Sequence, residues 1–106
     1  MDKFPDYINR KVCKEKLTIN QETLIKEIRQ VFVSQIVSAI DESEKSILLN
    51  FPEKLWPEHR IQICYELVER FGEVAILSKN GKYITTKLTD NKNDIPKNIE
   101  SVKIEF

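Results

Sequence analysis

The stretch PEHRIQICYELVERFGEVAILSKNGKYITTKL, residues 57–88, changes from a helical to a strand-like pattern at Gly72. Before Gly72, apolar residues recur three and four positions apart, the spacing of one helix face: Ile61, Cys64, Tyr65, Val68 and Phe71. Pro57 suits the first turn of a helix, and Gly72 is a typical residue to end one. The sequence therefore predicts a helix over 57–71 that leads directly into a strand.

After Gly72, residues 73–88 predict a β-hairpin whose turn is the Asn-Gly pair at positions 80 and 81. Both residue types adopt positive φ, as a two-residue type I′ turn requires. Such a turn pairs Ser78 with Tyr83. It also places Tyr83 on the same face of the hairpin as Val74 and Ile76, because side chains alternate along each strand.

Upstream, SILLNFP predicts a short buried strand over 46–51 that ends before Pro52. Residues 18–42 show helical spacing, and Thr18 with Gln21 matches a capping box. In the second half of this helix, valines widen the apolar stripe beyond one side, which is typical of a helix that has more than one neighbour. Residues 1–17 form a polar leader with net charge +2, which we expect to pack on the domain.

Downstream, DNKNDIPKN is a loop by composition, and SVKIEF, residues 101–106, predicts a one-sided edge strand. The order α-β-α-β-β-β predicts an α+β two-layer sandwich with a four-stranded mixed sheet, formed by one domain over 18–106. Strands 46–51 and 73–78, joined by helix 57–71, would be parallel neighbours in a right-handed β-α-β crossover.

Composition narrows the function classes. The chain of 106 residues has 17 basic and 17 acidic side chains, so its net charge is zero. Proteins that depend on phosphate contacts usually carry an excess of Lys and Arg. The start of the chain lacks the pattern of a secretory signal, and no apolar run is long enough to span a membrane. We therefore expect a cytosolic protein whose two cysteines are reduced.

Side chains for catalysis, cofactors or metals form no recognisable constellation. Cys13 and Cys64 are 51 positions apart and His59 is the only histidine, which does not suit a zinc site. Two glycines are too few for a phosphate loop or a dinucleotide fingerprint. Trp56 and His59 follow the strand over 46–51, at the end of a strand where small molecules dock in open α/β sheets. The favoured interpretation is that Trp56 anchors the connection on the core and that His59 is solvated. We expect no enzyme activity, cofactor or metal.

The hairpin suggests a protein-binding surface. If both helices cover one face of the sheet, the other face would expose an apolar patch, for which we predict Leu48, Val74, Ile76 and Tyr83. Soluble monomers seldom leave such a patch open. The alternative is that the helices divide between the two faces and that every apolar surface is covered within one chain.

Lys79, Lys82 and Lys87 flank Tyr83 and suggest phosphate contacts with a base stacked on the ring. Lysines at a hairpin tip also serve solubility and edge protection. The sequence thus favours a small adaptor, regulator or inhibitor that acts by protein contacts, alone or as a homodimer. The alternative is a nucleic-acid accessory protein that uses the hairpin lysines and the basic leader.

Overall fold

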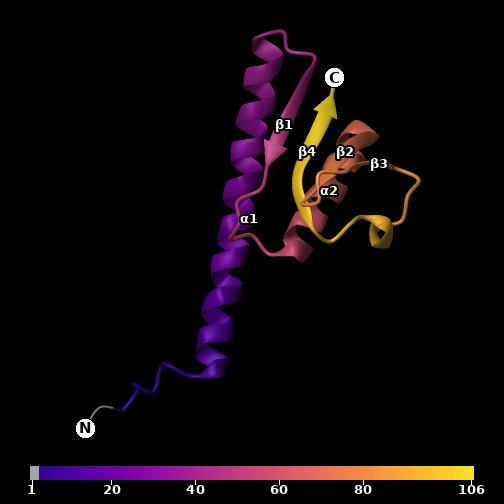
Figure 1. The fold of residues 1–106 in the computed structure, drawn as a ribbon. Coiled ribbons are helices and arrows are strands. Elements are labelled where there is room, and N and C mark those ends of the chain that lie inside the picture. Colours follow the sequence, from indigo (N-terminus) through magenta and orange to yellow (C-terminus); the bar gives the residue numbers. More distant parts are fainter. Residues whose placement is uncertain (1–2) are drawn as a thin grey trace.

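The computed structural model describes residues 3–106, so residues 1 and 2 of the expected leader lie outside the described part (Figure 1). Along the chain the elements are α1 (Arg10–Asp41), β1 (Ser46–Asn50), α2 (Pro57–Phe71), β2 (Glu73–Ser78), β3 (Tyr83–Lys87), the short 3-10 helix η1 (Lys92–Asp94) and β4 (Ile99–Glu105). Two helices and a four-stranded sheet confirm the α+β class.

The sheet is antiparallel throughout, with the strand order β1-β4-β2-β3, so the predicted mixed sheet is wrong. β1 and β2 run in the same direction, but β4 lies between them and pairs with both. The connection through α2 therefore crosses one intervening strand. β4, predicted at an edge, is central. Its polar Ser101 is only 1% exposed and donates a hydrogen bond to Asn50 Oδ1 at 2.5 Å, which explains how a central strand accommodates a hydroxyl.

α1 is 32 residues long and begins eight residues before the predicted start. Asn9 is its N-cap, because the side chain of Asn9 accepts a hydrogen bond from the Val12 N–H at 3.0 Å. Thr18 is inside the helix, where its hydroxyl donates to the carbonyl of Lys14. The capping-box prediction at Thr18 is thus wrong, and residues 10–17 of the expected leader are the first turns of α1, with exposed side chains apart from half-buried Val12.

Both helices cover the same face of the sheet. α1 packs on β1, and α2 packs on β2 and β4, with one shared core between the layers. The largest fully buried side chains in that core come from α2, the strands and the loop after β1: Leu49, Leu55, Ile63, Val68, Val74, Ile76, Ile99, Val102 and Ile104. Arg29 of α1 joins Glu66 of α2 through two hydrogen bonds of 2.8 and 2.7 Å. The sandwich therefore has one covered face and one open face.

The hairpin differs from the prediction by one residue of register. Leu77 pairs with Tyr83, and Ile76 with Ile84. The loop has three residues, 79–81: the Ser78 N–H donates to the Lys82 carbonyl, and the Gly81 N–H donates to the Ser78 carbonyl. Only Gly81 has positive φ here, at 86°, so the loop is a turn centred on Lys79 and Asn80 and followed by a left-handed Gly81, instead of a type I′ turn centred on Asn80 and Gly81.

Candidate functional site

The four predicted surface residues are divided between the two faces of the sheet. Val74 and Ile76 are 2% and 0% exposed and face the helices, whereas Leu48 and Tyr83 are 44% and 57% exposed on the other side. The one-residue change of register accounts for the separation, because it moves Tyr83 to the face opposite Val74 and Ile76.

The face not covered by the helices, here called the open sheet face, therefore has a different lining. There Lys103 lies between Leu48 and Ala75 across three strands, Leu77 lies beside the buried Ser101, and Tyr83 stands beside Leu77. Ala75, Leu77 and Lys103 are half-buried. The apolar part of this face is interrupted by polar residues, so it is a mixed surface.

α1 carries a second exposed apolar feature. Val33, Val37 and Ile40 are spaced four and three positions apart and therefore share one side of the helix. They are 59%, 51% and 56% exposed. The side of α1 that packs on the core carries other residues, among them Ile25, Ile28 and Phe32. We call Val33, Val37 and Ile40 the α1 stripe; the sequence signal for it was the wide apolar arc.

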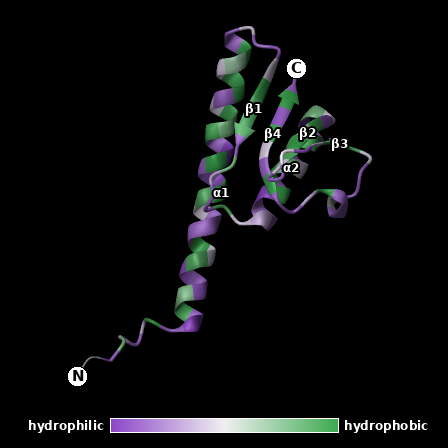
Figure 2. Cartoon of the chain, viewed as in Figure 1, coloured by the Kyte–Doolittle hydropathy of each residue, from purple (hydrophilic) through white to green (hydrophobic). Residues whose placement is uncertain are grey.

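The first part of α1 extends away from the rest of the fold (Figure 1). Figure 2 shows that hydrophobic segments occur along the whole of α1, including this extension. Leu17 and Ile19 are 51% and 60% exposed there. The apolar side chains of this extension therefore face solvent and are available for a further contact.

The three lysines proposed for phosphate contacts do not converge. Lys79 lies in the hairpin loop, where its ammonium is 3.4 Å from the Glu53 carboxylate. Lys87 pairs with Glu73 in the register of β2 and β3, and so lies on the side of Tyr83. Lys82 precedes Tyr83 and lies on the opposite side, because side chains alternate along the strand.

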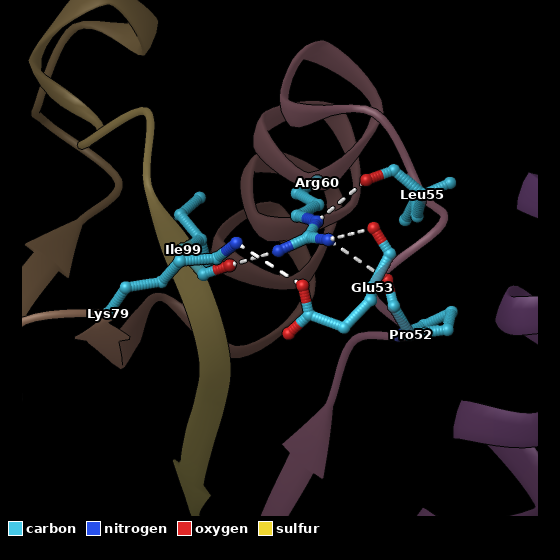
Figure 3. A network of polar contacts seen from close by, with 6 residues as sticks. All are labelled: Pro52, Glu53, Leu55, Arg60, Lys79 and Ile99. Atoms are coloured by element: carbon cyan, nitrogen blue, oxygen red, sulfur yellow. Dashed lines mark hydrogen bonds and ion pairs between the residues drawn. The ribbon is translucent and has the colours of Figure 1, made fainter.

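The loop between β1 and α2 is held by two buried polar side chains that sequence reasoning missed. Arg60 is 4% exposed and donates to four carbonyls, those of Leu55 (2.9 Å), Ile99 (2.7 Å), Pro52 (2.9 Å) and Glu53 (3.0 Å) (Figure 3). Gln21 of α1 donates to the Lys54 carbonyl and accepts from the Trp56 N–H. Together they satisfy most of the loop backbone, as buried polar groups require.

Trp56 is half-buried at the end of this loop, and its ring lies against that of His59 with centroids 5.8 Å apart. The Nδ1 atom of His59 is buried, and it has no hydrogen-bond partner among the described residues. Beside Trp56 is a hollow of about 420 Å³, here called the Trp56 hollow. Its lining comes from the loop, the start of α2, the hairpin and the approach to β4: Glu53, Leu55, Trp56, Pro57, Arg60, Lys79, Lys97 and Asn98.

The two cysteines differ in environment. Cys13 is exposed on the extension of α1, whereas Cys64 is fully buried in α2. Burial raises the pKa of the Cys64 thiol well above its ordinary value of 9.0, because the thiolate would lose its hydration. Hydrogen bonding to Glu66 likewise raises the pKa of Arg29.

Within residues 3–106, no three His, Cys, Asp or Glu side chains gather in a way that would hold a metal ion. In the same described part, neither helix combines the length and the apolar character that crossing a membrane requires. No family model matches the chain, and no curated protein or solved structure matches it either.

We predict that Arg60→Met lowers the free energy of unfolding by about 3 kcal/mol or more, because four carbonyls lose a buried charged donor. Arg70→Met, at an exposed position of the same helix, should cost less than about 1 kcal/mol. Urea unfolding of both variants measures the difference. Equal losses would show that the carbonyl contacts of Arg60 do not stabilise the loop.

We predict that Cys64 makes the protein less stable at alkaline pH. The folded state keeps the thiol protonated, whereas the unfolded state loses the proton above pH 9.0, the ordinary pKa. The free energy of unfolding should then fall by up to about 1.4 kcal/mol per pH unit more in the wild type than in Cys64→Ala. Cys13→Ala, which removes an exposed thiol, is the matched control. Parallel curves for wild type and Cys64→Ala would contradict the prediction.

Proposed function

We propose that the protein is a small non-catalytic adaptor, regulator or inhibitor that acts in the cytosol through protein contacts, alone or as a homodimer. The observation that carries this proposal is the α1 stripe of Val33, Val37 and Ile40, each more than half exposed on one side of the helix. β-Branched side chains at this spacing offer a ridge that packs well against another helix or sheet.

Two further surfaces support protein contacts. The extension of α1 presents Leu17 and Ile19 away from the core, where a second copy or another protein would cover them. On the open sheet face, Tyr83 is 57% exposed at the edge strand β3. Exposed tyrosines of this kind often anchor interfaces, because they combine a large apolar ring with a polar end.

The alternative function, nucleic-acid binding, draws on the extension of α1 as well as the hairpin. Arg10, Lys11, Lys14 and Lys16 lie on this exposed helix with Glu15 among them. Such a basic helix suits phosphate contacts. The separation of Lys82 from Lys87 across the hairpin, and the contact of Lys79 with Glu53, favour protein contacts as the primary function.

We predict that Val37→Asp weakens self-association or partner binding at least about tenfold, since a charge would have to be buried in the interface. Val31→Asp is the matched control, because Val31 is equally exposed, at 51%, on another side of α1. Light scattering over a concentration series measures self-association, and affinity capture from native lysate with nuclease measures other protein partners. A monomer that captures no protein, or equal effects of the two substitutions, would contradict the proposal.

The double charge reversal Lys79→Glu with Lys82→Glu distinguishes protein contacts from nucleic-acid binding. Under the protein-contact proposal, it leaves the affinity of a partner bound at the α1 stripe or the open sheet face unchanged, whereas Tyr83→Asp weakens a partner bound at the open sheet face. Under the alternative, affinity for DNA or RNA falls steeply with ionic strength and is lost on charge reversal. Titration of labelled single- and double-stranded oligonucleotides at several salt concentrations gives the measurement.

A further inference from the structure

We propose that the Trp56 hollow binds a carboxylate joined to an apolar group, either a free small organic acid or the C-terminus of a peptide. The hollow lies at the β1–α2 loop, and its residues are separate from those of the α1 stripe. The proposal therefore does not depend on how α1 contacts other molecules.

The charges around the hollow favour an anion. Arg60, Lys79 and Lys97 contribute three cations to its lining, and Glu53 contributes one carboxylate, a net charge of +2 in a chain whose total is zero. The three cations come from α2, the hairpin loop and the segment before β4, so the fold gathers them from distant parts of the sequence. Such local clustering attracts an oppositely charged ligand even when the whole protein is neutral.

Arg60 provides a second, independent reason. Arg60 is 4% exposed, and the ion pairs found among the described residues do not include it. The four carbonyls that it contacts accept from four of its five N–H groups, but they carry no net charge. A buried cation without a counter-ion is costly, and an anion in the adjacent hollow reduces that cost.

The carboxylate of Glu53 indicates which anion suits the hollow. It lies 3.4 Å from the Lys79 ammonium, and its side chain is 86% exposed (Figure 3). The carboxylate of Glu53 therefore already contacts one of the cations. Because this side chain is largely exposed, a ligand carboxylate can replace it. Surface pairs of this kind contribute little to stability, so the exchange is inexpensive.

The donors that remain suit a carboxylate better than a phosphate. Phosphate sites commonly use backbone N–H groups at a helix N-terminus. Here Pro57 has no N–H, and the N–H of Trp56 already donates to Gln21 Oε1 at 3.0 Å. The ammonium groups of Lys79 and Lys97 and the side-chain amide of Asn98 remain for the ligand.

The remaining wall of the hollow is apolar, so the ligand should carry an apolar group beside its carboxylate. Leu55 is 1% exposed, and Trp56 and Pro57 are half-buried and exposed, respectively, beside it. The contact between Trp56 and His59 limits the movement of the indole ring. An aliphatic or aromatic group next to the carboxylate would pack on this wall while the charge reaches the lysines.

Trp56 is the only tryptophan in the chain, so its fluorescence reports on the hollow directly. The probes are N-acetyl-leucine, N-acetyl-leucinamide and acetate, titrated into the full-length protein at low ionic strength. We expect a saturable change with N-acetyl-leucine alone, because the amide lacks the charge and acetate lacks the apolar group. Amide cross-peaks of Lys97 and Asn98 should shift in the same NMR titration.

Variants test the roles of the charges. Lys79→Gln and Lys97→Gln should each weaken the affinity about threefold to fivefold, and Glu53→Gln should strengthen it by removing the internal competitor. Lys82→Gln is the matched control, because Lys82 lies in the same hairpin but does not line the hollow. All four positions are exposed or near the surface, so the fold should be unaffected.

A peptide ending in leucine, with a free or amidated C-terminus, separates the two sources of the carboxylate. Binding of the free peptide at least tenfold tighter than that of N-acetyl-leucine identifies a protein C-terminus, whereas equal binding identifies a small acid. No saturable change up to about 10 mM, an equal response to the amide or to acetate, or unchanged affinity in Lys97→Gln would overturn the proposal.

Discussion

The contacts of Arg60 with four backbone carbonyls are the constraint on which the arrangement of the two layers depends. The loop after β1 must turn towards α2 while part of its backbone is buried, and buried carbonyls need donors. A guanidinium is the side chain that offers enough donors in a fixed plane. Because one of the four carbonyls belongs to Ile99, the same side chain also fixes the start of β4. Gln21 holds the opposite side of the loop and ties it to α1.

Local patterns identified the class of fold and most elements, but not the pairing of the strands. The Asn-Gly pair marks a hairpin turn, yet it fits both a two-residue loop and a three-residue loop that places glycine in the left-handed region. What decides between them is burial on β3, since the observed register pairs Thr86 with Val74 on the core side, where Thr86 is 5% exposed. β4 was misplaced for a similar reason. The burial of Ser101 depends on Asn50, 51 positions away, which no local pattern reveals.

Arg60 and Gln21 show how polar residues inside an apolar pattern escape notice. Arg60 precedes Ile63 and Cys64 by three and four positions, and Gln21 precedes Ile25 by four, so both occupy core-facing positions of their helices. The spacing of Arg60 and Gln21 from these apolar residues was the sequence signal that both side chains face the core. Composition-based interpretation nevertheless assigns Arg and Gln to the solvent, because these residues are usually exposed. The Trp56 hollow could not be predicted from the sequence for another reason, since its cations come together only in the tertiary structure.

The placement of both helices on one face explains where contacts with other molecules remain available. α1 uses one side to cover β1, and along the α1 stripe Val33, Val37 and Ile40 stay more than half exposed. The Trp56 hollow arises differently, where the loop between β1 and α2 meets the hairpin loop and the residues just before β4. A substitution that removes the contacts of Arg60 with the loop would therefore disturb the Trp56 hollow before the α1 stripe, because Arg60 both holds the loop and lines the hollow. Arg60 thus couples the stability of the fold to the Trp56 hollow, whereas the α1 stripe is independent of it.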